Sequence, residues 1–507
     1  MIDTAFVFAN NMVLQREIPV PVWGTGTPGA EVTVILQGQE VTARVGQDGK
    51  WSAMLQPLTA SAGETMVIRS GADERIIENV SVGEVWIASG QSNMEFHMRY
   101  DQDYSSETEI CANENIRFFD VPVIPTEKNG QLFDYTKNFG FWRMACPADL
   151  EWFSAVGYYF AKNLQPALDV PVGIIGLNCG GSKCCCWMDE ETLQECGPVW
   201  MEDYLTGLKS ISDYEKAEAE YNRSGLGDHS QPFADPVMDH MMYGMSIEEI
   251  ESTHRHMLES GGLVIGPWAE WRPSGLYHMM AERIIPYAVR GVLWYQGESD
   301  EDHPEIYADM LNGLIGLWRK KWGYRLPFII AQLAPLGEVI GPGGRVYPIL
   351  RKQQQYVAEH TQEVYLAATG DVGHTYDIHP KEKQPVGRRM ALLARGHVYG
   401  EDLLCDAPVP DSVSRDNDCI AIHFKNAEGG LVLKGEKIEA MQVFIDGNEL
   451  DSPDYMLDKE QSRLILRIPK RDASEHQTEI RFAETPYFKV NLYNQSDIPV
   501  IPFTVQT

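Results

Sequence analysis

Several features that place a protein in a membrane or on a nucleic acid are missing from this chain of 507 residues. No apolar run approaches the roughly 20 residues that a membrane-spanning helix needs. Basic residues are scarce, since 42 Lys and Arg stand against 73 Asp and Glu, for a net charge of -31. Nucleic acids and anionic membranes select basic surfaces, so we expect neither as a partner. The composition leaves the oligomeric state open.

No signal peptide is visible in the sequence as given, because the first six residues, Met1 to Phe6, lack a basic segment and a long apolar one. This predicts a cytoplasmic protein for the chain as given, and a secreted or periplasmic one if a signal peptide has been removed. The nine cysteines show no C-x-x-C spacing, and Cys184, Cys185 and Cys186 are adjacent. We interpret them as free thiols of a reducing compartment, and we expect no metal and no cofactor.

What is present is a globular composition, 44% hydrophobic and 23% charged, at a length that suggests more than one domain. Residues 1–81 contain short alternating runs such as Glu31–Leu36 and Met66–Arg69, separated by glycine-containing turns, and predict a β-sandwich. Residues 82–400 alternate apolar strands with helical patterns and predict an α/β core. Residues 401–507 return to a β pattern and predict a second β-domain.

The core pattern is that of a parallel sheet covered by helices on both faces. The expected strands are Val82–Ser89, Val172–Asn178, Val292–Tyr295, Phe328–Leu333 and Val364–Thr369. The expected helices are Phe153–Ala167, Leu276–Ala288, Pro304–Trp322 and Ile349–His360. Residues 188–270 interrupt the alternation and are expected to form an insert or lid near the site.

Ser92 follows the first of these strands, after Gly90, where a helix begins. The carboxyl ends of parallel strands are where open α/β sheets bind ligands, so Ser92 is a candidate nucleophile. The alternative is a serine that caps the helix. The G-x-S-x-G pattern of α/β-hydrolases is not met, because Met94 replaces the last glycine.

Partners for such a serine follow later strands. Gly180 and Gly181 follow the second strand, and paired glycines let backbone N–H groups approach a ligand, although they also suit a tight turn. Gln296 and Glu298 follow the third. The Gln296 amide can donate to an oxyanion and Glu298 can orient a neighbour. The alternative is a polar strand end that caps a helix.

Two histidines follow the fifth strand, each near an aspartate: Asp371 with His374, and Asp377 with His379. Pro380 and a helical pattern come directly after His379, which places it at the edge of the sheet and favours it as the base. A base that works on a serine is expected to titrate near neutrality. The specificity constant kcat/KM should then rise with pH through about 6–7.

Taken together, these segments resemble the sialate O-acetylesterase family of the SGNH-hydrolase superfamily. The likeness spans nearly the whole chain, and its specificity comes from the combination. The matching segments are Met12–Arg16, Gly83–Trp86, Gly90–Met94, Leu276-Tyr277, Trp294–Ser299, Asp377–Pro380, Gly387–Arg389 and Asn491–Asn494.

The resemblance implies a flavodoxin-like three-layer core with accessory all-β domains at both ends. It implies an esterase that removes O-acetyl groups from carbohydrates, foremost from sialic acid, through an acyl-enzyme. Ser92 would be the nucleophile and His379 the base. An oxyanion hole would come from the Ser92 N–H, Gly180 or Gly181, and the Gln296 amide, supported by residues that include Gln91 and Asn93.

The third member of a triad is less determined, because Tyr376 stands where the superfamily places its aspartate. Asp377 is the nearest carboxylate, Glu298 is an alternative, and a Ser–His dyad is another. The chain also departs from its relatives at Ser182–Cys186 and at His278.

Two other functions fit the same sequence. One is an esterase of the same superfamily that acts on acetylated xylan, since substrate choice depends on pocket walls rather than on catalytic residues. The other is a non-catalytic carbohydrate-binding protein. The intact set of Ser92, Gln296 and His379 argues against it.

Overall fold

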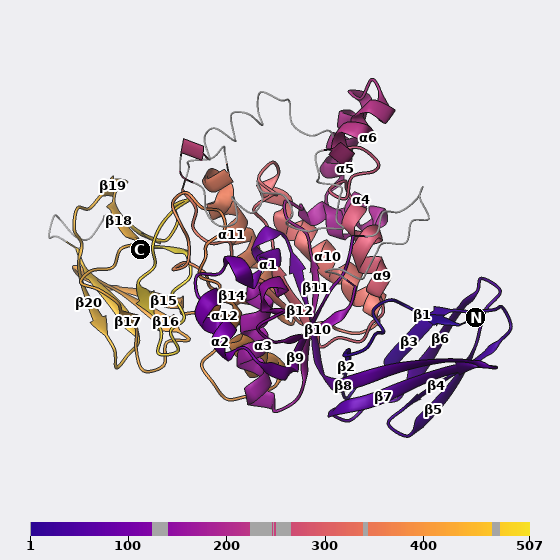
Figure 1. The fold of residues 1–507 in the computed structure, drawn as a ribbon. Helices are drawn as coiled ribbons and strands as arrows, with labels where there is room; N and C mark the ends of the chain where they lie inside the picture. Colours follow the sequence, from indigo (N-terminus) through magenta and orange to yellow (C-terminus); the bar gives the residue numbers. More distant parts are fainter. Residues whose placement is uncertain are drawn as a thin grey trace.

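The computed structural model describes residues 2–123, 140–223, 246, 248–249, 265–337, 343–468 and 477–507. A central mixed sheet lies among helices, and all-β regions stand at the two ends of the chain (Figure 1). The expected α/β class with all-β ends is therefore confirmed. In the described ranges, no helix has the length and apolarity that crossing a lipid bilayer requires.

The N-terminal region consists of two sheets with alternating burial. In β4 (Glu31–Leu36), Val32, Val34 and Leu36 are buried while the residues between them face outward, as the alternating sequence predicts. One sheet contains β1 (Asp3–Thr4), β3 (Val20–Thr25) and β6 (Lys50–Leu55). The other contains β5 (Gln39–Arg44), β4, β7 (Ser61–Ser70) and the start of β8 (Asp73–Gly90).

Strand β8 continues from this region into the core without a break. Its first half pairs antiparallel with β7 and parallel with β2 (Val13–Gln15). Its second half lies between β11 (Val172–Asn178) and β12 (Gly291–Tyr295), parallel to both. A boundary between residues 81 and 82 falls inside this strand, so the division of the chain into domains stays a prediction.

The core sheet contains the five predicted strands in the order β11-β8-β12-β13-β14, which reads 2-1-3-4-5 along the chain. All of these pairs are parallel. Strands β13 (Phe328–Ala331) and β14 (Val364–Ala367) end earlier than predicted. Beyond β11, the sheet is extended by β9 (Asn113–Asp120) and by the antiparallel β10 (Trp142–Ala145).

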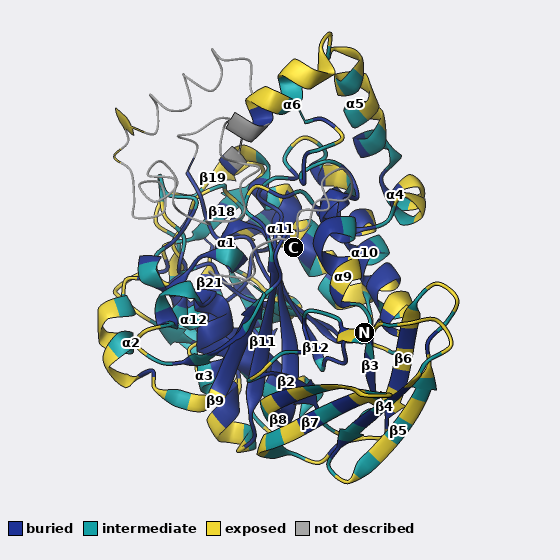
Figure 2. Cartoon of the chain, turned by 45° about the vertical axis from the view of Figure 1, so that its right-hand side comes forward, coloured by how far each residue is buried: buried dark blue, intermediate teal, exposed yellow. Residues whose placement is uncertain are grey.

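Both faces of the core sheet are buried, which explains the continuous apolar run that ends at Ser89. Val85 and Ile87 of β8 belong to the cluster that contains residues of α10 (Tyr307–Trp322) and α11 (Gly343–His360). Trp86 and Ala88 point the other way, into the cluster with α3 (Ala155–Leu168) and α12 (Gln384–Leu393). Figure 2 shows these strands buried along most of their length.

The predicted helix Leu276–Ala288 is only partly helical. A π-helical turn covers Tyr277–Ala281 and a short helix, α9, covers Glu282–Ile284. Pro286 disfavours helical geometry at Ile285, which is extended, so the helix ends there. Of the proposed insert, residues 190–223 form α4 (Glu190–Cys196), α5 (Pro198–Lys209) and α6 (Tyr214–Arg223), and most of the remainder lies outside the described residues.

The other predicted core helices are present with shifted ends. Residues Pro304–Ile306 form a 3-10 turn before α10, and α11 includes Pro348 rather than starting after it. The adjacent cysteines lie in a buried 3-10 turn, Cys184–Trp187. All nine cysteines are free thiols, as expected.

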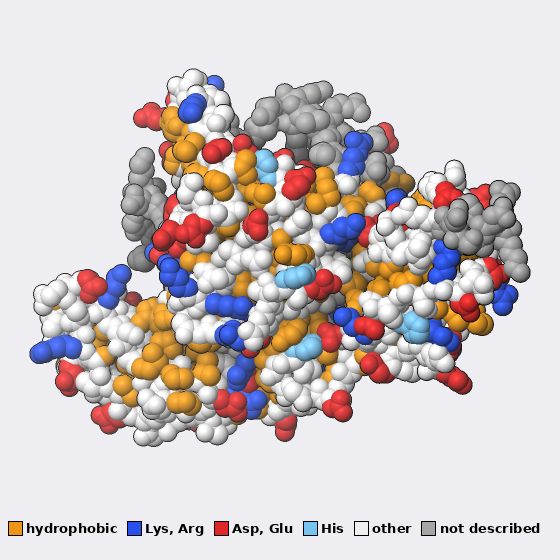
Figure 3. Space-filling model, turned by 180° about the vertical axis from the view of Figure 1, so that it is seen from behind, with side chains coloured by type: hydrophobic (Ala, Val, Ile, Leu, Met, Phe, Trp, Pro, Cys, Tyr) orange, Lys and Arg blue, Asp and Glu red, His pale blue; other side chains and the backbone are white. Residues whose placement is uncertain are grey.

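The C-terminal region also forms two main sheets around its own apolar core. On the face seen in Figure 3, basic side chains are interspersed with acidic ones among the described residues. One sheet has the order β15 (Val409–Asp416), β16 (Cys419–Lys425), β21 (Arg463–Arg467) and β20 (Asp454–Asp458). The other has the order β19 (Asn448–Glu449), β18 (Met441–Ile445), β22 (Thr478–Phe482) and β24 (Phe503–Gln506). A short pair, β17 (Val432–Leu433) with β23 (Leu492–Tyr493), accompanies them.

Gly83 supplies a test of how tightly β8 is held where it enters the core. A Cβ at this position would lie 1.9 Å from the carbonyl oxygen of Pro171, so Gly83→Ala forces the backbone apart. We expect a loss of about 3 kcal/mol in the free energy of unfolding, measured by denaturant titration. The control is Gly207→Ala in α5, where the new methyl meets no atom within 4 Å and stability should not fall. Equal stability of the two variants would contradict this packing.

Candidate active site

The serine is presented by a tight turn at the carboxyl end of β8. Gly90 has φ +133°, and a Cβ on it would lie 2.1 Å from the carbonyl oxygen of Tyr295, so only glycine fits between β8 and β12 here. The chain then enters α1 (Ser92–Glu95), with Gln91 at the cap position and no side-chain capping bond. Ser92 is therefore the first helical residue, and its hydroxyl is not used as a cap.

The hydroxyl instead contacts a histidine from the segment that follows the last strand of the core sheet. His379 lies between β14 and α12, and its Nε2 is 2.8 Å from the Oγ of Ser92. Both residues are buried, with 4% of His379 and 7% of Ser92 exposed. A hydroxyl in hydrogen-bond contact with an imidazole is the geometry that general-base activation of a serine needs.

The rival histidine is placed differently. His374 is exposed, and its Nδ1 accepts hydrogen bonds from the backbone N–H groups of Tyr376 and Asp377. Asp371 accepts two hydrogen bonds from the guanidinium of Arg389, at 2.7 and 2.6 Å. The spacing of Asp371 and His374 therefore reflects a structured loop rather than an acid–base pair.

Neither candidate carboxylate contacts the imidazole of His379 among the described residues. The Oδ1 of Asp377 accepts the backbone N–H of His379 at 2.8 Å, and its Oδ2 pairs with Lys381 at 3.1 Å. The Oε1 of Glu298 accepts from the Nδ2 of Asn93 at 2.5 Å. Asp377 thus holds the main chain of His379, and among the described residues no carboxylate joins the contact between Ser92 and the imidazole.

The Gly180-Gly181 segment is fixed by two side chains. The N–H of Gly180 donates to Glu95 at the end of α1, and its carbonyl accepts from the Nε1 of Trp271 at 2.8 Å. In a trans peptide the C=O and the next N–H point in opposite directions, so the N–H of Gly181 points away from Trp271. A Cβ on Gly180 would lie 3.5 Å from that of Ser92, so this segment borders the serine.

Gln296 is an anchor of the same region. Its side-chain amide, fully buried, donates towards Gln91 Oε1 at 3.2 Å, the Ser182 carbonyl at 3.1 Å and Asp300 Oδ2 at 2.5 Å. An amide has two N–H groups, and these three acceptors occupy both. The expected donation of Gln296 to an oxyanion therefore stays a prediction. It requires that one of these bonds be released.

Gln91 ties the serine turn to the loop after β12. Its Oε1 accepts from the backbone N–H groups of Gly297 and Ser299, at 3.3 and 3.2 Å, as well as from Gln296. With 2% of Gln91 exposed, these bonds form in a region shielded from water, where they are strong. The predicted supporting residues Gln91 and Asn93 thus both contact the segment around Glu298.

The electrostatics of His379 differ from the expectation of titration near pH 6–7. Burial, followed by the charges of Lys383 and Lys381, lowers the pKa of His379 to about 3. The imidazole is therefore neutral across the physiological range, and the neutral form is the one able to accept a proton from Ser92. Burial also raises the pKa of Asp300, the partner of Gln296, to about 6.

Several residues at the site were not predicted from the sequence. Glu95 and Trp271 hold Gly180, Asp300 holds Gln296, and Lys383 lies close enough to affect His379. Trp271 is separated from Gly180 by the whole of the proposed insert, 188–270, so proximity in sequence does not predict their contact. Glu95 and Asp300 directly follow the motifs Gly90–Met94 and Trp294–Ser299, and this position is the signal that could have indicated their role.

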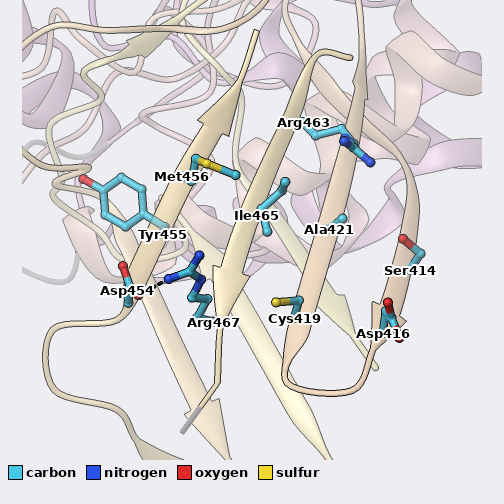
Figure 4. A pocket seen from close by; sticks show the side chains of 10 residues that line it. All are labelled: Ser414, Asp416, Cys419, Ala421, Asp454, Tyr455, Met456, Arg463, Ile465 and Arg467. Carbon is cyan, nitrogen blue, oxygen red and sulfur yellow. Dashed lines mark ion pairs between the residues drawn. The ribbon is translucent and has the colours of Figure 1, made fainter. Parts of the chain in front are cut away.

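A surface pocket of the C-terminal region and the one cluster of potential metal ligands found among the described residues lie elsewhere. The pocket in Figure 4 is on the exposed face of the β15-β16-β21-β20 sheet, where Asp454 and Arg467 are 3.7 Å apart. His397, Cys405 and Asp406 converge within 4.8 Å beside Tyr365 of β14. Neither contains Ser92 or His379, so neither enters the chemistry of this pair.

Comparisons with known proteins point to carbohydrate esterases. The family model for carbohydrate esterases described as sialic acid-specific acetylesterases matches residues 257–394, which include Gln296 and His379. The sialate O-acetylesterase of Mus musculus is 28% identical over 442 residues, covering 80% of this chain and 75% of the relative. That of Homo sapiens is 26% identical over 444 residues, covering 80% and 72%. The crystal structure of a carbohydrate acetylesterase from Xanthomonas citri superposes with a TM-score of 0.75 at 26% identity and 100% coverage of both chains.

A buried serine–histidine contact at the carboxyl edge of the sheet, together with these relatives, defines an ester hydrolase. Within that class, the chain is similar to the sialate O-acetylesterases, which match it over 80% of its length.

The depressed pKa of His379 gives an expectation for the pH dependence. A group whose pKa is lowered stays neutral down to lower pH, so the base remains competent in mild acid. We expect kcat/KM for an acetyl ester to stay within about twofold between pH 7 and pH 5 and to fall only below that range. An acid limb with a midpoint between pH 6 and 7 would instead indicate an unperturbed imidazole.

The two histidines are separated by matched substitutions. His379→Ala removes the group in contact with Ser92 and should lower kcat by at least about 10³-fold. His374→Ala removes an exposed side chain and should cost less than about tenfold. Asp377→Asn should fall between them, because it weakens the bond to the His379 main chain. The reverse ranking of the histidines would reassign the base.

Proposed function

We propose that this protein is a serine O-acetylesterase of the SGNH-hydrolase superfamily that acts on carbohydrates, foremost on O-acetylated sialic acid. The observation that carries the proposal is the 2.8 Å contact between Ser92 Oγ and His379 Nε2 in a buried site. The strand order 2-1-3-4-5, with helices on both faces, supports a flavodoxin-like three-layer core. The names of the relatives support the substrate class.

The reaction follows from the contact. His379 Nε2 removes the proton of Ser92 as its Oγ attacks the acetyl carbonyl, which gives a tetrahedral oxyanion and an imidazolium. Collapse of this intermediate breaks the ester bond, and the imidazolium returns its proton to the departing sugar hydroxyl. A water molecule, deprotonated by His379, then attacks the acetyl-enzyme. The bond to Ser92 breaks, the imidazolium returns its proton to Ser92 Oγ, and acetate leaves.

Donors for the oxyanion are available from the backbone. The Ser92 N–H stands in the first turn of α1, where helix N–H groups have no partner within the helix. The N–H of Gly180 is occupied by Glu95, so Gly181 is the better donor of the two. The Gln296 amide would join them if substrate displaced one of its present acceptors.

The substrate is decided by the walls around this pair. The indole of Trp271 is half-buried beside Gly181 and offers an apolar surface for a sugar ring. Acetate release compared between O-acetylated sialic acids and acetylated xylo-oligosaccharides tests the choice. We expect a higher kcat/KM on the sialic acids, and a preference for xylan fragments would reassign the substrate within the same esterase class.

Replacement of the nucleophile tests the mechanism. Ser92→Ala removes the attacking oxygen, and we expect kcat on an acetylated sugar to fall by about 10⁶-fold, with an unchanged unfolding transition. The matched control is Ser106→Ala, an exposed serine of α2 (Tyr104–Ile110) whose hydroxyl contacts only a backbone carbonyl in the described structure. Retention of more than a tenth of the wild-type kcat by Ser92→Ala would exclude the serine mechanism.

A further inference from the structure

A lysine is buried beside the catalytic pair. Lys383 stands directly before α12, with only 1% of its surface exposed. Its Nζ donates to Asn93 Oδ1 at 2.5 Å and lies 4.6 Å from the ring centre of Phe96. Lysine is almost never fully buried unless it is paired, because removing an ammonium from water is costly. A lysine buried in this position therefore calls for a role.

The partner of Lys383 is the residue after the nucleophile. The amide of Asn93 accepts from Lys383 through Oδ1, and through Nδ2 it donates to Glu298 at 2.5 Å and to the Ile378 carbonyl at 3.0 Å. Asn93 follows Ser92, and Ile378 precedes His379. A single buried amide therefore joins the segment of the nucleophile to the segment of the base.

The chemistry of its neighbours fixes how this amide is turned. A carboxylate can only accept, so the nitrogen of Asn93 faces Glu298 and its oxygen faces Lys383, whose Nζ donates to it. The second N–H of that nitrogen is then left for the Ile378 carbonyl. If the amide were reversed, its N–H groups would face the ammonium and the carbonyl of Ile378 would lose its donor.

We propose that Lys383 is a positioning residue of the esterase, which holds the Asn93 amide so that the backbone before His379 is fixed against Ser92. The inference rests on the proposed serine mechanism. It adds a second constraint to the bond between the His379 N–H and Asp377, since neither Asp377 nor Glu298 contacts the imidazole among the described residues. The Lys383–Asn93–Glu298 chain orients the base through its main chain.

The charges around the lysine are consistent with this arrangement. Burial, together with Lys381, lowers the pKa of Lys383 to about 7, although Glu298, Asp377 and Asp101 favour its charged form. Lys383 and Lys381 both lower the pKa of His379. The two lysines thus share an electrostatic effect on the base, and only Lys383 contacts Asn93 in the described structure.

That difference defines the experiment. Lys383→Met keeps the length of the side chain and removes the donor, and we expect kcat to fall about 100-fold, as for a misplaced catalytic group, with KM changed less than about threefold. Lys381→Met removes one charge from the same surroundings and should keep kcat within about threefold. Both variants should move the acid limb of kcat/KM to higher pH, because each removes a positive charge near His379.

A second variant keeps the proposal testable if Lys383→Met folds poorly. Asn93→Ala removes the amide itself and should lower kcat by a similar factor. The kcat of the double variant should be no lower than that of the less active single variant, because the two residues act as a unit. Thermal unfolding of each variant separates loss of fold from loss of position.

Three outcomes overturn the proposal or its basis separately. Equal kcat in Lys383→Met and Lys381→Met would show that the lysine acts by charge alone. Independent, multiplicative effects of the Asn93 and Lys383 substitutions would show that they do not form a unit. An active Ser92→Ala would instead remove the serine mechanism, whatever the lysine variants do.

Discussion

The two hydrogen-bond ladders of β8 are the interaction on which the geometry of the site depends. This strand is paired on both sides within the core and buried on both faces, so its carboxyl end has little freedom. The end of the strand is held further by the close contact between Gly90 and the carbonyl of Tyr295. The position of Ser92 is therefore fixed by the sheet. The remaining loops have only to place His379 and the backbone N–H groups of the Gly180-Gly181 segment beside it.

The sequence predicted those parts of the fold that follow from local pattern. All five core strands were expected, because a parallel sheet buried on both faces requires continuous apolar runs. Ser92 and His379 were expected as partners because each follows such a run. The end of the helix at Ile285 was missed, although Pro286 carries the signal. The continuity of β8 was missed because the change from a β pattern to alternating strands and helices near residue 82 was interpreted as a domain boundary, whereas one strand runs through it.

The parts of the site that could not be predicted depend on tertiary contact. Trp271 donates a hydrogen bond to the carbonyl of Gly180, which is distant in sequence, and no periodicity in the chain predicts this contact. Lys383 would be assigned to the surface by its residue type, since lysine is rarely buried. Glu298 was considered as a partner of the base, but whether it reaches His379 or Asn93 depends on separations of a few ångströms between loops. Residue type and spacing predict which segments gather, and packing decides which atoms touch.

The buried turn that holds Cys184, Cys185 and Cys186 bears on how the molecule responds to oxidants. Burial raises the pKa of the Cys184 thiol, and a hydrogen bond with Cys186 together with burial raises that of Cys185. Oxidation and alkylation proceed through the thiolate and require access, so a protonated and enclosed thiol reacts slowly. The covalent state of this part of the core is therefore expected to change slowly when oxidants are present in the surrounding solvent.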